Sequence, residues 1–172
     1  MNIIHFLLGM NRMVALRHVG PSDLPVLYAH QLDAAACHMA AFTSDDPTDR
    51  AAFDAHWVKI LAKDTVIART IVVRDAAGAE HVAGHIASFM RDADREVTYW
   101  IGREFWGKGV ATRPLKLLLE EVTDRPIYGD AAADNTPSIR VLEKCGFIED
   151  RRERGFANAR GEEIEEVVMR LG

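Results

Sequence analysis

Residues 96–121 read EVTYWIGREFWGKGVATRPLKLLLEE and contain the segment that decides the fold. The first six residues alternate in polarity as a β-strand does, and the last ten carry the apolar spacing of an amphipathic helix. Between them, Gly107 and Gly109 bracket Lys108. Glycine lets the backbone come close to a ligand, and the free amides at a helix start present the positive end of its dipole. The segment therefore predicts an anion cradle suited to a pyrophosphate.

Three classes of ligand use a strand, a glycine loop and a helix in this order. A mononucleotide P-loop needs Ser or Thr directly after Gly-Lys to hold magnesium, but Gly109 and Val110 follow Lys108. A dinucleotide fingerprint needs a third small residue where this chain has Thr112, and its acidic ribose ligand would have to be Asp130. The NTPase class is therefore rejected, and the dinucleotide class matches poorly.

The third class is coenzyme A. Residues 104–109, EFWGKG, resemble the coenzyme A loop of the GNAT superfamily of acetyltransferases, Gln/Arg-x-x-Gly-x-Gly/Ala, with Glu104 in the place of Gln or Arg. Residues 135–147, NTPSIRVLEKCGF, resemble the second signature of that superfamily, Asn-x-x-Ser/Ala followed by a short helix that ends at Gly-Phe. The resemblance covers residues 16–171 and is nearest the branch of ribosomal-protein and other protein N-terminal acetyltransferases.

The resemblance implies an α+β fold, a GNAT-like mixed and mostly antiparallel twisted sheet of six to seven strands flanked by about four helices. We expect residues 1–12 to be an N-terminal extension of uncertain role and residues 13–172 to form a single domain. Periodicity predicts strands at 14–18, 66–74, 82–90, 96–101 and 127–132, a last hairpin that turns near 158–161, and helices at 22–32, from Pro47 or Thr48 to 63–64, 110–122 and 137–145.

Composition limits the partners. The chain has 172 residues, 48% of them hydrophobic, and 26 acidic against 21 basic residues give a net charge of -5. This balance argues against general nucleic-acid binding and mildly favours cationic partners. Cys37 and Cys145 fit neither a disulfide framework nor a metal motif, so we expect a cytoplasmic protein. We expect it to be a monomer or homodimer. The apolar run 3–8 is too short to span a membrane and lacks the features of a signal peptide.

By the same resemblance, the ligand is acetyl-CoA. The strand before the loop is expected to splay from its neighbour, so that free amides near Trp100 to Gly102 bind the pantetheine arm and polarise the thioester carbonyl. Loop amides would then hold the pyrophosphate, and basic side chains would add charge. No metal is expected, because His81 and His85 lack a third ligand. The predicted coenzyme-binding residues are Trp100, Ile101, Gly102, Arg103, Trp106, Gly107, Lys108, Gly109, Val110, Ala111, Thr112, Asn135 and Ser138.

Two residues are the catalytic candidates. Many members of the superfamily protonate the departing thiolate with a tyrosine one helical turn after the Ser/Ala position, but this chain has Leu142 there. The ribosomal-protein branch implies that Ser138 is the acid, while an alternative is that Asn135 and Ser138 only cap a helix. Glu96 is the candidate base that deprotonates the amine through water, and its alternative is a solvated residue at a strand edge.

The sequence therefore predicts an N-acetyltransferase that transfers an acetyl group from acetyl-CoA to a primary amine by direct attack in a ternary complex. The acceptor is a protein N-terminus or a small-molecule amine, and the residues do not separate the two. The competing hypothesis is a non-catalytic acyl-CoA-binding or regulatory module on the same fold, which the absence of the tyrosine favours.

Overall fold

Seven strands form one sheet in the order β1-β2-β3-β4-β5-β7-β6 in a computed structural model that describes residues 14–172. The predicted extension, residues 1–12, lies outside the described residues. Neighbouring strands are antiparallel except β4 and β5, which are parallel. The strands are β1 (Val14–His18), β2 (Ile67–Arg74), β3 (Glu80–Arg91), β4 (Asp94–Ile101), β5 (Ile127–Ala132), β6 (Ile148–Ala157) and β7 (Glu162–Leu171).

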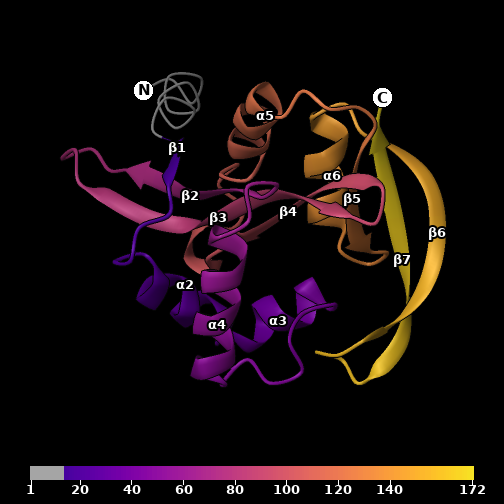
Figure 1. The fold of residues 1–172 in the computed structure, drawn as a ribbon, viewed down its shortest axis with the longest axis horizontal. Helices are drawn as coiled ribbons and strands as arrows, with labels where there is room; N and C mark the ends of the chain where they lie inside the picture. The colour runs from indigo at the N-terminus through magenta and orange to yellow at the C-terminus, as the bar shows by residue number, and fades with distance from the viewer. Residues whose placement is uncertain (1–13) are drawn as a thin grey trace.

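Helices cover both faces of this sheet (Figure 1). On one face lie α5 (Thr112–Glu121) and α6 (Thr136–Lys144), and on the other lie α2 (Leu24–Gln31), α3 (Ala34–Ala40) and α4 (Arg50–Leu61). Within residues 14–172, no helix is long and apolar enough to cross a membrane. The predicted fold class, a mixed and mostly antiparallel α+β sheet, is confirmed.

Each face of the sheet has its own hydrophobic core, because alternate residues of a strand point to opposite faces. On the α5 and α6 face, the apolar stripe of α5 packs against inward-facing strand residues. On the α2 and α4 face, aromatic residues of α4 cover β2 and β3, and Trp57 packs in this second core. The largest contributors are Ile71, Ile86, Leu115, Leu118 and Leu142 to the first core and Leu27, Phe53 and Trp57 to the second.

The structure corrects the predicted helices before β2. No helix was predicted between residue 32 and Pro47, but this segment contains α3, and α4 begins at Arg50 rather than at Pro47 or Thr48. Both helices start after an aspartate. The side chain of Asp33 accepts a hydrogen bond from the amide of Ala36 at 2.8 Å, and Asp49 caps α4 in the same way. An N-cap aspartate satisfies one of the free amides of the first turn, which fixes the start.

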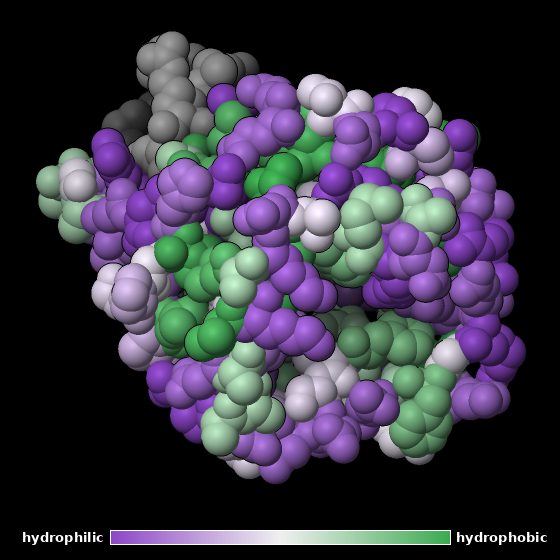
Figure 2. All heavy atoms as spheres, viewed as in Figure 1, coloured by the Kyte–Doolittle hydropathy of each residue, from purple (hydrophilic) through white to green (hydrophobic). Residues whose placement is uncertain are grey.

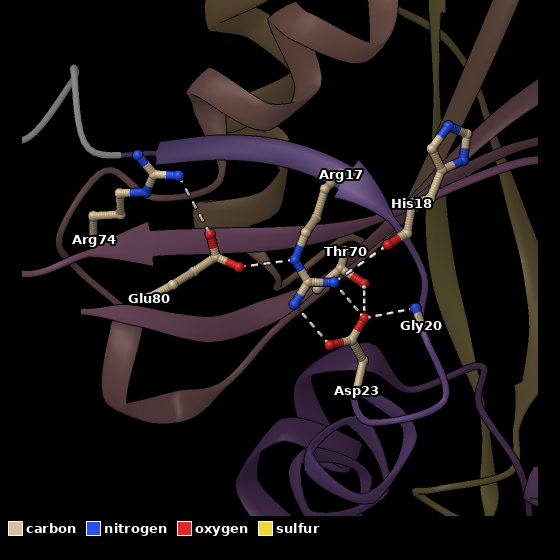
Figure 3. A network of polar contacts seen from close by, with 7 residues as sticks. All are labelled: Arg17, His18, Gly20, Asp23, Thr70, Arg74 and Glu80. Carbon is tan, nitrogen blue, oxygen red and sulfur yellow. Dashed lines mark hydrogen bonds and ion pairs between the residues drawn. The ribbon is translucent and has the colours of Figure 1, made fainter. Parts of the chain in front are cut away.

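A buried ion pair holds α2 against the edge of the sheet (Figure 3). Both guanidinium ends of Arg17 on β1 donate to the carboxylate of Asp23, at 2.6 and 2.8 Å. The amide of Gly20 and the hydroxyl of Thr70 complete the shell of Asp23, which is 1% exposed. Burial alone raises the pKa of Asp23, but the bond from Arg17 and the two other donors outweigh it and hold this pKa below its usual value.

Candidate active site

The sheet opens between β4 and β5. These two strands share only two register pairs, Arg95 with Ile127 and Glu96 with Tyr128, whereas β3 and β4 share eight. Beyond Glu96, β4 runs on to Ile101 with β3 on one side and no β5 partner on the other. The predicted splay is therefore present, and the polar groups along this side of β4 face a gap.

The amides that line the gap differ from those predicted. The amide of Gly102 donates to the carbonyl of Ala83 on β3 at 2.8 Å, so the expectation that this amide is free is wrong. Successive amides of a strand point to opposite sides, so those of Ile101 and Tyr99 point into the gap. Trp100 lies two residues before Gly102, so its carbonyl and amide point to the β3 side like those of Gly102.

The loop after β4 is an open anion cradle. It begins with the 3-10 helix η1 (Arg103–Phe105), and Gly107 and Gly109 have φ values of 70° and 71°, in the left-handed region that favours glycine. Within residues 14–172, the amides of residues 107–111 have no acceptor. Ala111, at the N-cap of α5, has no side-chain group that could cap the helix. Five consecutive free amides at a helix start fit a pyrophosphate.

The side chains of this loop are held by the protein itself. Lys108 donates to the carbonyl of Glu104 at 2.7 Å, and the Trp106 indole donates to the carbonyl of Ile101 at 2.8 Å. Arg103 forms an ion pair with Asp33, the residue that caps α3, at 3.3 Å. Val110 is buried in the core, so only its backbone can reach a ligand, and Ala111 and Thr112 stand at the start of α5.

The second predicted motif starts α6 beside the gap. Asn135 caps this helix: its side-chain oxygen accepts from the amide of Ser138 at 3.2 Å, and its side-chain nitrogen donates to the carbonyl of Met39 at the end of α3, at 3.0 Å. The capping alternative thus holds for Asn135, and its contact with pantetheine stays a prediction. Leu142, at the position of the missing tyrosine, is 1% exposed in the core.

Tyr99 is a residue of this site that the sequence analysis missed. Its phenol oxygen lies 2.7 Å from the hydroxyl oxygen of Ser138 and 3.2 Å from the carbonyl oxygen of the same residue. Burial raises the pKa of Tyr99 to about 12, although the bond with Ser138 opposes the rise. The alternation along β4 could have placed Tyr99 on the face opposite Glu96, but only the packing of α6 shows its partner.

An acidic cavity lies on the other side of β4, under α3. It has a volume of about 220 Å³, and Figure 2 shows the surface hollowed between α3 and the β5 and β7 strands. Arg91 bridges two carboxylates there, at 2.9 Å from Glu96 and 3.5 Å from Asp130. The residues that define the cavity are Phe42, Phe89, Arg91, Glu96, Asp130 and Glu166.

The carboxylates of this cavity have raised pKa values. Burial first and the charge of Asp130 second raise the pKa of Glu96 to about 7, against the opposing charge of Arg91. Glu166 reaches about 7 for the same leading causes, and burial raises the pKa of Asp130. Glu96 is 9% exposed, so the alternative of a solvated strand edge is wrong. A carboxyl with a pKa near neutrality can exchange a proton with an amine at physiological pH.

The two histidines considered as metal ligands contact different partners. His81 pairs with Asp75 at 2.8 Å in the β2–β3 hairpin, whereas the ring of His85 packs edge-on against Trp57. In the part of the chain that the structure describes, no cluster of three or more His, Cys, Asp or Glu could hold a metal ion.

Comparison with known proteins gives the class of this fold and site. The sequence model of the acetyltransferase (GNAT) domain matches residues 14–148, and the chain therefore belongs to the GNAT acetyltransferase family. It is similar to an uncharacterized N-acetyltransferase, p20, of Bacillus licheniformis (24% identity over 106 residues) and to a putative ribosomal N-acetyltransferase, YdaF, of Bacillus subtilis (36% over 63). The matches cover 59% and 34% of this chain, and the chain spans 60% and 34% of these relatives.

Solved structures share the whole fold at low sequence identity. Spermidine N-acetyltransferase from Vibrio cholerae, determined in complex with CoA and spermine, superposes with a TM-score of 0.75 at 19% identity, over 93% of this chain and 95% of that one. RimJ of Mycobacterium smegmatis, in complex with CoA-disulfide, gives 0.75 at 20% identity, over 92% and 81%.

Proposed function

We propose that this protein transfers an acetyl group from acetyl-CoA to a primary amine. The observation that carries the proposal is the gap between β4 and β5: the acidic cavity lies around Glu96, where the two strands part, and the amide cradle at residues 107–111 follows the end of β4. An anionic pyrophosphate fits the first and a cationic amine fits the second. Family membership and the CoA-bound structures of the same fold support this assignment.

Each group then has a role in the reaction. The carboxylates around the cavity attract the ammonium form of the acceptor, and Glu96 accepts its proton, directly or through water. The amides of Tyr99 and Ile101 face the gap, where they bind pantetheine and polarise the thioester carbonyl. The neutral amine attacks the carbonyl carbon, and Ser138 donates a hydrogen bond to the sulfur as the C–S bond breaks.

The transfer is direct, without a covalent enzyme intermediate. Burial raises the pKa of both cysteine thiols, Cys37 and Cys145, which keeps them protonated and makes them poor nucleophiles. Both cysteines are free, which supports our proposal of a reducing cytoplasm. We propose that residues 13–172 act as one domain, as a monomer or homodimer, on a protein N-terminus or a small-molecule amine. The acidic cavity favours acceptors that are cationic at neutral pH.

The test measures thiol release from acetyl-CoA with a panel of small amines and N-terminal peptides, beside calorimetric binding of acetyl-CoA. Glu96→Gln should lower turnover about 100-fold or more and leave acetyl-CoA affinity unchanged. Glu121→Gln, in an ion pair with Arg69 on the other face of the sheet, is the matched control. Binding of acetyl-CoA without thiol release for any acceptor would assign the regulatory module instead.

A further inference from the structure

We propose that Tyr99 is a positioning residue, which directs the hydroxyl proton of Ser138 toward the sulfur of coenzyme A. The inference rests on the proposed function, because it concerns how the departing thiolate is stabilised. It adds to the site a residue that neither sequence motif contains.

The hydrogen bond between these residues crosses the opening of the sheet. Tyr99 lies on β4 three residues beyond Glu96, the last residue paired with β5, and Ser138 lies in the first turn of α6, which follows β5. The distance of 2.7 Å between the two hydroxyl oxygens therefore ties together the elements that diverge around the gap. A ligand arm that enters the gap must pass beside this pair.

The phenol of Tyr99 can donate to either the hydroxyl or the carbonyl oxygen of Ser138, and this choice determines where the hydroxyl hydrogen of Ser138 points. When Tyr99 donates to the hydroxyl oxygen of Ser138, at 2.7 Å, the Ser138 hydrogen must point elsewhere, and a ligand in the gap can accept it. When Tyr99 donates to the Ser138 carbonyl, at 3.2 Å, Ser138 can instead donate to the phenol oxygen. Once a thiolate in the gap can accept the hydrogen of Ser138, the arrangement in which Tyr99 donates to the Ser138 hydroxyl is favoured, because that contact is the shorter of the two.

The electrostatics of Tyr99 fit a donor. Its pKa of about 12 keeps the phenol protonated throughout the neutral range, so it always has a hydrogen to donate. The ring packs against the core formed with α5 and α6, which fixes the direction of the hydroxyl. Without this partner, a serine hydroxyl in a helix can turn to a carbonyl of the preceding turn instead.

The proton balance of the step is complete. The C–N bond forms, the C–S bond breaks, and the electron pair of that bond goes to sulfur. Ser138 and Tyr99 keep their own protons: Ser138 donates a hydrogen bond to the departing thiolate, and the thiolate then takes its proton from solvent. Glu96 returns the proton of the amine to solvent. The sum is amine plus thioester to amide plus thiol, with no further reactant.

An equilibrium measurement tests the inference without any acceptor. A hydrogen bond to the thiolate favours the charged form and lowers the pKa of the thiol of bound coenzyme A, which ultraviolet absorbance of the thiolate reports. We expect this pKa to be higher by about 0.5 unit or more in Tyr99→Phe than in the wild type, and by at least as much in Ser138→Ala. The same pKa in the wild type and Tyr99→Phe would overturn the inference.

Kinetics provide the second arm. Tyr99→Phe should lower kcat about fivefold with an unchanged KM for acetyl-CoA, and the double variant with Ser138→Ala should be no slower than Ser138→Ala alone, because the two hydroxyls act as one unit. Effects that multiply would show that Tyr99 acts independently of Ser138. Tyr28→Phe, which removes a phenol bonded to the carbonyl of Thr48 at 2.6 Å, is the matched control and should change neither quantity.

The two arms separate the inference from the function on which it rests. A lowered thiol pKa that depends on Tyr99, in a protein that acetylates no amine of the panel, would refute the acetyltransferase assignment and keep the role of Tyr99. Full acetyl transfer by the wild type, with Tyr99→Phe equal to it in rate and in thiol pKa, would do the reverse.

Discussion

Arg91 is the positive charge that limits the rise in the pKa of the proposed base, Glu96, so its removal should move the pH profile in a known direction. Burial and Asp130 raise the pKa of Glu96 to about 7, and Arg91 opposes them from 2.9 Å. Arg91→Met takes away the positive charge and keeps an apolar side chain of similar length. The neutral form of Glu96 is then favoured further, and its pKa rises.

The size of the shift follows from the geometry. Two unit charges 2.9 Å apart interact by about 1.4 kcal/mol at the dielectric constant of water, which corresponds to about one pKa unit. The high dielectric is appropriate because the side chain of Arg91 is 59% exposed. At pH 7 the ionised fraction of Glu96 should therefore fall from about a half to about a tenth, and activity about fivefold.

The assay is the pH dependence of kcat/KM, which reports ionisations of the free enzyme. The acidic limb should move up by about one unit in Arg91→Met, with wild-type activity regained near pH 9. Asp130→Asn should move the limb in the opposite direction, because it removes a negative neighbour of Glu96. Arg69→Met, which breaks the ion pair with Glu121, should leave it in place. A loss of activity in Arg91→Met that is equal at every pH would refute the argument and make Arg91 a substrate contact.

Three further outcomes are expected. Gly107→Val should weaken coenzyme A binding tenfold or more in calorimetry. Because residue 107 has a left-handed backbone, the substitution should also lower the free energy of unfolding by about 1–2 kcal/mol. Wild-type affinity in the folded variant would remove the loop from the site. Asp23→Asn should lower the free energy of unfolding by about 2–3 kcal/mol in urea titrations at pH 7, because the substitution removes the buried carboxylate that pairs with Arg17. The folded-state pKa of Asp23 is below its usual value, so its contribution is present above about pH 4 and disappears as the pH falls further, which predicts that variant and wild type converge in acid. Acetyl-CoA at a hundredfold excess over its Kd should stabilise the protein by about 2.7 kcal/mol in thermal melts, and an equal shift with ATP or NAD would contradict a coenzyme A site.

Local patterns in the sequence were sufficient for most of the fold. The glycine loop, the stripe of α5 and the cap of α6 depend on residues within one turn or one strand, and these elements were predicted. Helix α3 was missed because its seven residues, AAACHMA, show no apolar period. The signal that could have found it is Asp33, an N-cap residue directly before three alanines.

The site was predicted less completely, because its chemistry combines distant strands. Arg91, Glu96, Asp130 and Glu166 lie on β3, β4, β5 and β7, and only the strand order brings them to one cavity. Glu96 was found because it stands at the start of a recognisable strand. Asp130 was considered only as a ribose ligand, and nothing local to Glu166 distinguishes it from the neighbouring glutamates.

Contacts at both ends of helix α3 fix the length of this segment in the fold. At its start, Asp33 binds Arg103 of the coenzyme loop, and at its end, the carbonyl of Met39 binds Asn135, the cap of α6. One inserted residue would turn everything beyond it by about 100° and advance it by about 1.5 Å, so both ends could not stay in place. Surface segments usually vary in length among related proteins. In α3, a change of acceptor preference must therefore come from substitution of side chains, while the number of residues stays constant.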